Sequence, residues 1–278
     1  IGNPVGHSVS PAIHNNLAEL TGKDMVYTTF KVEKGDVAAA VKGAYSLNIL
    51  GLNVTVPHKS EVIDTLVDID PLAKAIGAVN TLVRVDGGFK GFNTDISGLA
   101  RELEDEGIEL ENSKVIILGA GGAARAITFL CSSKGAQTIY LLNRTVDKAQ
   151  AIAQAVNTHF NNDKVIPMNI ADYEDIPGED YIVIQTTSVG LHPNDDAVVI
   201  DDEAFYRKAA VGVDIIYNPA ETKFMKLIKA QGKKAYNGLK MLLYQGVSAY
   251  ELWNDCKITR EEADEVYKRL EKELGINE

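Results

Sequence analysis

The sequence has few residues of the kinds that mark an oxidising compartment or a membrane. Its 278 residues include only two cysteines, Cys131 and Cys256, which lie far apart and in apolar helical patterns. We expect two buried free thiols, because a disulfide framework needs several patterned cysteines. No apolar run is long enough to cross a bilayer, and no signal peptide precedes Ile1. These absences predict a cytoplasmic protein that contacts no membrane.

Positive charge is also scarce. The chain has 28 lysines and arginines against 39 acids, which gives a formal net charge of −11. Proteins that bind nucleic acid usually carry a basic face, so nucleic acid is not expected as a partner. The five histidines lack the spacing of metal ligands and no cysteine pair exists, so no metal site is predicted.

The order of the segments indicates an α/β fold with two domains. Strand-like segments such as Val26–Val32, Leu50–Val56 and Val115–Leu118 alternate with helical ones such as Ser60–Val67 and Ala123–Ser133. This alternation is typical of parallel sheets with crossover helices. Asp86-Gly87-Gly88, between the strand-like segments Val79–Val85 and Phe89–Phe92, is expected to form a hairpin turn. A chain of 278 residues is also near the size at which one core splits into two. Ile1 to Pro4 read like the end of a strand, and a few native residues are expected before them.

The domain boundary is expected in the helix after Asp95. The tail, Leu239–Trp253 and Glu261–Leu274, is entirely helical and has no strands of its own. We expect these helices to pack on the first domain. The predicted domains are therefore residues 1–97 plus 239–278, with a mainly parallel sheet, and residues 98–238, with a Rossmann fold.

A glycine-rich turn carries the strongest local signal. A buried strand beginning at Val115 runs into a G-x-G-x-x-A turn and then a helix, as in dinucleotide-binding proteins. The first glycine allows the tight turn, the second lets a pyrophosphate approach the backbone, and the helix N-terminus offers free N–H groups. The predicted cofactor-binding residues here are Gly119, Ala120, Gly121, Gly122 and Ala123.

The end of the next strand distinguishes the two nicotinamide cofactors. NAD enzymes usually place an acid there, whereas NADP enzymes offer an arginine to the 2′-phosphate. This chain has Asn143, Arg144 and Thr145 at that point, followed by Lys148. We therefore expect NADP, with Arg144 binding the phosphate. Lys148 is either a second phosphate ligand or a solvated surface residue, and Asp147 is interpreted as a first-turn acid after a Thr145 cap.

Polar residues also gather in the first hundred positions. Ser8 and Ser10 precede a helix, and two hydroxyls at a helix N-terminus suit a carboxylate ligand. Ser10 followed by Pro11 is equally a good capping pair. Lys59 follows a strand, where a lysine is usually only a surface charge, and Asp95 precedes a helix that it could simply cap.

Together these motifs resemble the shikimate dehydrogenase family. The matches are GNPVGHSVSPAIHN from Gly2, NVTVPHK from Asn53, GAVNT from Gly77, GFNTD from Gly91, GAGGAARA from Gly119, NRT from Asn143, TTSVG from Thr186, DIIYNP from Asp214 and GLKMLLYQ from Gly238. They come in family order over almost the whole chain. Three residues depart from the family pattern: Gln185, where the family more often has asparagine, Lys148, where many NADP-dependent members have arginine, and Lys240.

The resemblance implies a role for each matched residue. It makes Lys59 and Asp95 the catalytic pair, and the two serines the ligands of the substrate carboxylate. Asn143, Thr145 and Thr187 would join the cofactor site. The remaining implied substrate or nicotinamide contacts are Thr55, Asn80, Tyr217, Gly238 and Gln245.

The implied activity is the reversible NADPH-dependent reduction of 3-dehydroshikimate to shikimate in aromatic amino-acid biosynthesis, in a cleft between the two domains. Two alternatives stay open. One is an NAD-using quinate/shikimate dehydrogenase, against which Arg144 and the missing acid argue. The other is a non-catalytic NADP-binding sensor, which the presence of both Lys59 and Asp95 disfavours. The only expected partners are small molecules, in a monomer or a homodimer.

Overall fold

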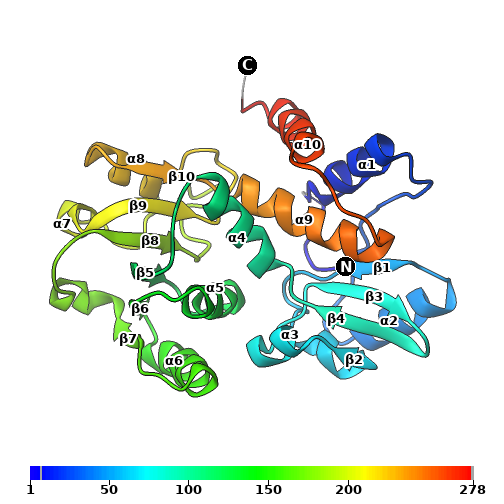
Figure 1. Cartoon of the computed structure of the whole chain (residues 1–278), viewed down its shortest axis with the longest axis horizontal. Coiled ribbons are helices and arrows are strands. Elements are labelled where there is room, and N and C mark those ends of the chain that lie inside the picture. The colour runs from blue at the N-terminus through cyan, green and yellow to red at the C-terminus, as the bar shows by residue number, and fades with distance from the viewer. Residues whose placement is uncertain (7, 277–278) are drawn as a thin grey trace. The chain divides into compact units, whose positions relative to one another are not determined.

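The computed structural model describes residues 1–6 and 8–276, which form two compact units (Figure 1). Unit 1 comprises Ile1–Glu102 and the chain from Leu242 onward, and unit 2 comprises Leu103–Met241. The chain passes between the units within two helices, α4 (Asp95–Asp105) and α9 (Leu239–Asn254). Each unit has its own sheet and its own hydrophobic core.

Unit 2 contains a parallel sheet of six strands in the order β10-β9-β8-β5-β6-β7. Every pairing in it is parallel, and the central strand β8 is buried along its whole length, as its apolar sequence YIVIQ requires. The chain order reverses between β5 and β8, so the carboxyl ends of these two strands form a topological switch point. The strands are β5 (Lys114–Leu118), β6 (Thr138–Asn143), β7 (Val165–Asn169), β8 (Tyr181–Gln185), β9 (Ala209–Asp214) and β10 (Lys234–Tyr236).

The helices of unit 2 pack against this sheet. Helix α5 contacts β5 and β6, α6 contacts β6 and β7, and α8 contacts β9 and β10. The predicted alternation of strands and helices is thus confirmed, as is the Rossmann-type α/β class. The helices are α5 (Gly122–Ser133), α6 (Val146–Phe160), α7 (Glu203–Arg207) and α8 (Lys223–Ala230), with a 3-10 turn η2 at Ile170–Asp175.

The sheet of unit 1 is mixed, where a mainly parallel one was expected. Its four strands follow the order β1-β3-β4-β2. The predicted hairpin at Asp86-Gly87 makes β3 and β4 antiparallel, and β1 also runs antiparallel to β3. Only β2 pairs in parallel with its neighbour, β4. The strands are β1 (Gly51–Asn53), β2 (Asp68–Ile69), β3 (Thr81–Val85) and β4 (Gly88–Phe92).

Helices from both ends of the sequence belong to unit 1. Helix α1 packs against α10, and Leu17, Tyr244 and Val266 share one core with neighbouring apolar side chains. Helix α10 and most of α9 thus belong to the same unit as the first part of the chain. The helices are α1 (Ser10–Thr21), α2 (Val37–Ser46), α3 (Pro71–Ile76) and α10 (Arg260–Glu273), with a 3-10 turn η1 at Glu61–Thr65.

Two expected elements of unit 1 differ from the structure. Ser60–Val67 forms only the short η1 turn instead of a helix. Val26–Val32 is extended but is not a ladder strand, and its one sheet-like contact is the bridge between Gly2 and Lys31. The segment nevertheless keeps strand alternation, with Val26 83% and Phe30 50% exposed while Tyr27 is half-buried.

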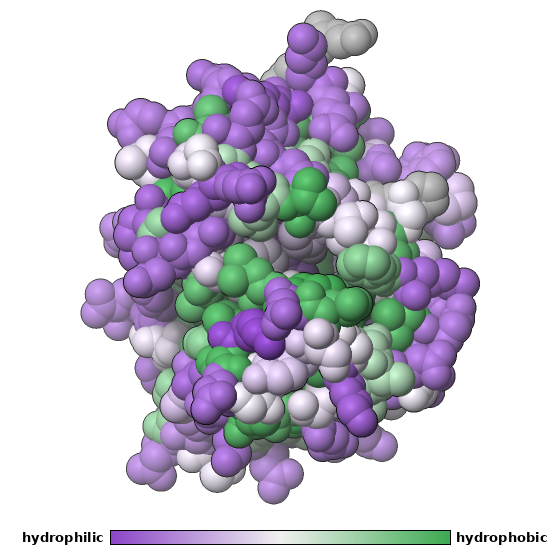
Figure 2. All heavy atoms as spheres, turned by 90° about the vertical axis from the view of Figure 1, so that its right-hand side faces the viewer, coloured by the Kyte–Doolittle hydropathy of each residue, from purple (hydrophilic) through white to green (hydrophobic). Residues whose placement is uncertain are grey.

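Figure 2 shows hydrophobic side chains near the middle of the face it presents, with hydrophilic ones around them. No helix within residues 1–6 and 8–276 is long and apolar enough to cross a membrane. Both cysteines are free; Cys131 is buried as expected, but Cys256 is only half-buried because it lies in the connection between α9 and α10.

Candidate functional site

The glycine-rich turn lies at the carboxyl end of β5. Gly119 has a φ of +111°, and a Cβ there would lie 2.7 Å from Oγ1 of Thr186. Only glycine therefore fits this turn. Ala124, which is fully buried, keeps α5 close to the sheet.

The start of α5 is open and uncapped. Gly121 is the N-cap residue, and no side chain caps it. A Cβ on Gly121 or Gly122 would meet no atom within 4 Å. Both glycines are exposed, and the neighbouring Ala120 and Ala123 are half-buried. The first N–H groups of α5 are thus available to an anion, with the positive end of the helix dipole behind them. This cradle fits the pyrophosphate of a dinucleotide.

The end of β6 presents cationic side chains. Arg144 and Lys148 are both exposed, and neither forms an ion pair with another described residue. Nδ2 of Asn143 donates to the carbonyl of Thr145 at 2.8 Å and closes the turn. Thr145 is the N-cap residue of α6, but its side chain makes no capping hydrogen bond, so the expected cap is wrong in that respect.

Three further predicted residues follow the carboxyl ends of β8, β9 and β10. Thr187 follows β8, and its hydroxyl accepts a hydrogen bond from the N–H of Val189 at 3.1 Å. Gly238 packs on the backbone at Ile215, where a Cβ would come within 2.2 Å of the carbonyl oxygen. Tyr217 is half-buried, and its burial raises the pKa of the phenol. These residues occupy the same strand edge as the glycine turn, because all strands of the sheet are parallel.

Asp214 at the end of β9 was not singled out as a site residue. It is fully buried, and burial raises the pKa of its carboxyl to about 6. Its oxygens accept hydrogen bonds from Oγ1 of Thr222 at 2.7 Å and from the N–H of Ile216 at 3.0 Å. Asp214 thus fixes the loop that carries Tyr217.

In unit 1 the sequence separates Lys59 and Asp95 by 36 residues, and the fold joins them. Nζ of Lys59 lies 2.6 Å from Oδ2 of Asp95, with the lysine side chain 25% and the aspartate side chain 12% exposed. Nδ2 of Asn80 donates to the other oxygen, Oδ1 of Asp95, at 2.9 Å. Asp95 does not cap α4; its own N–H is bound by Oδ1 of Asn93 at 3.1 Å.

The two serines occupy the start of α1. Ser8 is exposed, and its Oγ accepts a hydrogen bond from the N–H of Ser10 at 3.3 Å. The N-cap residue is Val9, and Ser10 is already inside the helix without a capping bond, so the alternative capping role of Ser10 is wrong. Both hydroxyls are therefore placed at an uncapped helix N-terminus.

The remaining predicted substrate contacts have different surroundings. Thr55 is exposed, just beyond β1. Gln245 on α9 is 9% exposed, and its Nε2 donates to the carbonyl of Leu242 at 2.8 Å.

Lys240 departs from the family pattern. It forms ion pairs with Glu106 and with Asp105 at the end of α4, so the lysine has a structural role in this chain.

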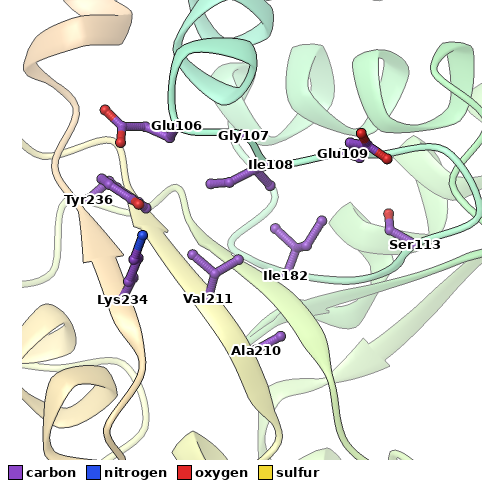
Figure 3. Close-up of a pocket in the computed structure, with 10 residues that line it drawn as sticks. All are labelled: Glu106, Gly107, Ile108, Glu109, Ser113, Ile182, Ala210, Val211, Lys234 and Tyr236. Atoms are coloured by element: carbon purple, nitrogen blue, oxygen red, sulfur yellow. The ribbon is translucent and has the colours of Figure 1, made fainter.

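A cavity of about 370 Å³ lies in unit 2 (Figure 3). Its walls include Ile182 and Val211, from the first halves of β8 and β9, and Lys234 and Tyr236 of β10. The glycine turn follows the carboxyl end of β5, so the cavity lies at the opposite edge of the parallel sheet. None of the predicted site residues lines it. Within the described residues, no cluster of three or more acids, histidines or cysteines could hold a metal.

The parallel sheet with its glycine turn defines the class of unit 2, a Rossmann-type nucleotide-binding fold. Comparison with known proteins supports a more specific assignment. The sequence model "Shikimate dehydrogenase substrate binding domain" matches residues 1–82, and the model "Shikimate / quinate 5-dehydrogenase" matches residues 99–215. The shikimate dehydrogenase (NADP(+)) of Bacillus cereus strain AH820 is 41% identical over 92% of this chain and 91% of its own length.

Solved structures agree with this match. The chorismate mutase/shikimate 5-dehydrogenase fusion protein of Clostridium acetobutylicum has a TM-score of 0.87 at 34% identity, over 99% of this chain and 97% of its own. The shikimate 5-dehydrogenase of Thermus thermophilus, solved with NADP(H) and shikimate, has a TM-score of 0.84 at 31% identity, over 96% and 97% of the two chains. The chain belongs to the shikimate dehydrogenase family.

Proposed function

We propose that the protein is an oxidoreductase that reduces 3-dehydroshikimate to shikimate reversibly with NADPH. The observation that carries the proposal is the Lys59–Asp95 ion pair held by Asn80. A lysine side chain that a carboxylate holds in one position can donate a proton to a ketone oxygen. The relatives supply the substrate and the cofactor by their names.

The cofactor would bind to unit 2. The bare N–H groups at the start of α5 would bind its pyrophosphate, and Arg144 its 2′-phosphate, with Lys148 adding charge. Bound NADPH would supply the hydride. Gly119 sets the turn, while Asn143, Thr145, Thr187 and Gly238 shape the backbone around the proposed site.

Unit 1 would bind the substrate and supply the proton. Ser8 and Ser10 would bind the carboxylate, and Thr55, Asn80 and Gln245 the ring hydroxyls. Lys59 would donate the proton at the carbonyl oxygen. Asp95 would orient Lys59 through Oδ2 and accept a hydrogen bond from a neighbouring substrate hydroxyl. In this proposal residues 1–97 with 239–278 form the substrate domain, and residues 98–238 the NADP domain.

The absorbance of the reduced nicotinamide at 340 nm provides the test. The protein is given shikimate with NADP, shikimate with NAD, and quinate with each cofactor. Rapid reduction with shikimate and NADP alone supports the proposal and the role of Arg144. Comparable rates with NAD or quinate would identify the broader quinate/shikimate activity, and NADP binding without any turnover would favour a sensor. The cytoplasmic location and the monomeric or homodimeric state stay predictions.

A further inference from the structure

The side chain of Asn93 joins two loops of unit 1, and Asn93 is not among the residues predicted for the site. It directly follows β4 and is half-buried. Its Oδ1 accepts a hydrogen bond from the N–H of Asp95 at 3.1 Å, and its Nδ2 donates to the carbonyl of Ala78 at 3.0 Å. Because one partner is a donor and the other an acceptor, the Asn93 amide has a single orientation.

The peptide group that accepts from Asn93 also binds Lys59. The carbonyl of this group belongs to Ala78 and its N–H to Val79, and the Val79 N–H donates to the carbonyl of Lys59 at 2.8 Å. Three hydrogen bonds in series therefore connect the backbone of Lys59 to the backbone of Asp95. Since the side chains of these two residues also meet, 2.6 Å apart, the connection is a closed ring.

Neither backbone group bound by Asn93 has another hydrogen-bond partner among the described residues. Asp95 is the first residue of α4, where an N–H group has no partner within the helix. Asp95 is 8% and Ala78 4% exposed, so water reaches these groups poorly. A buried N–H or carbonyl without a partner is costly, so both groups should move if the Asn93 amide is removed.

The side chain of Asn80 has a different task in the same place. Its Nδ2 donates to Oδ1 of Asp95 at 2.9 Å, and its Oδ1 accepts from the N–H of Thr94 at 2.7 Å. Asn80 thus sets the rotation of the Asp95 carboxylate without any help from Asn93. The Asp95 N–H and the peptide group behind Lys59 are held by Asn93 instead.

Other hydrogen bonds hold each loop, so the chain should fold without the Asn93 amide. The N–H of Asn80 donates to the carbonyl of Phe92 at 3.0 Å, and the N–H of His58 donates to the carbonyl of Thr55 at 3.0 Å. Loss of the amide should therefore shift one loop relative to the other and leave the fold intact.

We propose that Asn93 is a positioning residue, which sets the spacing between the backbones of Lys59 and Asp95 and so places the proton donor against the substrate carbonyl. The inference rests on the proposed shikimate dehydrogenase activity. Without the amide, Lys59 reaches the carboxylate from a displaced backbone. Misplacement of a reacting group by about 1 Å can cost on the order of 10²-fold in rate, so a smaller shift should cost less.

The test compares Asn93→Ala with the unaltered protein in steady-state kinetics with shikimate and NADP, with rates corrected for the folded fraction. We expect kcat and kcat/KM for shikimate to fall together by about three- to tenfold, because the amide acts on the chemical step. The KM for NADP should stay within about twofold, since the NADP site is proposed in unit 2. Urea unfolding of the same samples measures the change in stability.

The matched control is Asn157→Ala. Asn157 lies near the end of α6 in unit 2, is half-buried like Asn93, and is outside the proposed site. Its Oδ1 accepts from the N–H of Val165 at 3.0 Å, and its Nδ2 donates to the carbonyl of Val165 at 3.0 Å. Both variants lose one accepted and one donated backbone hydrogen bond, so both should lower the urea midpoint. Only Asn93→Ala should lower kcat.

A second variant, Asn93→Ser, restores one of the two hydrogen bonds. A serine hydroxyl can accept from the N–H two residues further on, here that of Asp95, but it is too short to replace the bond to Ala78. We expect its kcat to lie between those of Asn93→Ala and the unaltered protein.

Each result decides the inference. It is overturned if Asn93→Ala keeps kcat within twofold of the unaltered protein, or if Asn157→Ala loses as much kcat as Asn93→Ala. If Asn93→Ala does not fold, Asn93→Ser decides alone by the same twofold limit. Absence of shikimate turnover in the unaltered protein would instead refute the proposed function, so the two failures are distinguishable.

Discussion

Lys59 and Asp95 form a hydrogen-bonded ion pair, with Nζ 2.6 Å from Oδ2, although the two residues reach it from different elements. Lys59 precedes the η1 turn, and Asp95 is the first residue of α4. The second carboxylate oxygen is bound by Asn80, so the pair has one defined geometry.

Replacing Lys59 by methionine should abolish most of the activity. Methionine keeps much of the side-chain volume but cannot donate a proton, and loss of a positioned acid typically costs at least about 10²-fold in kcat. Steady-state kinetics with shikimate and NADP would measure the loss. Lys90→Met is the control, because Lys90 pairs with Asp68 at 2.7 Å in the same sheet and should keep near-normal kcat. Near-normal turnover in Lys59→Met would refute the role of Lys59.

Replacing Arg144 by alanine should weaken the binding of NADP and leave the binding of NAD unaffected. Charge-assisted hydrogen bonds to a 2′-phosphate contribute about 1.5–3 kcal/mol, so the KM for NADP should rise by roughly 10- to 100-fold. The control is Arg207→Ala, which removes another exposed arginine of unit 2. It should change the KM for neither cofactor. If Arg144→Ala raised the KM for NADP and the KM for NAD equally, Arg144 would not bind the 2′-phosphate.

The two glycines of the turn should respond differently to alanine. At Gly119 the φ of +111° and the contact with Thr186 predict a loss of about 1–3 kcal/mol in the free energy of unfolding. At Gly121 a Cβ meets no atom within 4 Å, so the loss should be at most about 1 kcal/mol. The added methyl group there instead occupies space that a pyrophosphate would need.

Urea unfolding and NADP titration would separate these two effects. Gly119→Ala should lower the urea midpoint, whereas Gly121→Ala should weaken NADP binding at nearly unchanged stability. A Gly121→Ala protein that binds NADP normally would contradict the proposed phosphate cradle.

Asp214 should make unfolding depend on pH. Its folded pKa of about 6 lies above the value of about 3.9 for an exposed aspartate, so the folded state holds the proton more tightly. This contribution is complete below about pH 4 and is lost as the pH rises through about 6. It amounts to about 3 kcal/mol at most. The free energy of unfolding of the unaltered protein should therefore fall, relative to Asp214→Asn, between about pH 4 and pH 7.

Urea titrations of both proteins at each pH would measure this difference. In the variant the Thr222 hydroxyl can turn and accept a hydrogen bond from the amide, so the loop should still form. A constant difference across this pH range would show that the Asp214 carboxyl titrates normally.

The sequence predicted the elements of the fold that depend only on residues close together in the chain. The turn at Gly119 follows from one strand, one helix and the glycine spacing, and the hairpin at Asp86-Gly87 follows from its turn residues. By contrast, strand β10 and helix α7 have only three and five residues, too short for a periodic pattern. The parallel expectation for unit 1 was wrong because a hairpin forces its two central strands to be antiparallel.

The hydrogen-bond network that joins Tyr27 and Asn53 to Thr81 could not be found in this way. It depends on the register that places Asn53 opposite Thr81 in β1 and β3, and a shift by one residue would turn both side chains to the other face. It also depends on Asn15 holding an extended segment that forms no ladder. Side-chain partners 26 and 28 residues apart leave no pattern in a single sequence.

The two free thiols differ in a way that is useful at the bench. Cys131 is buried, and burial raises its pKa to about 12, so it should resist alkylation in the folded protein. Cys256 is half-buried in the connection between α9 and α10. A maleimide dye or spin label would therefore attach to one known position, in unit 1 and outside the proposed catalytic residues, without any change to the native sequence.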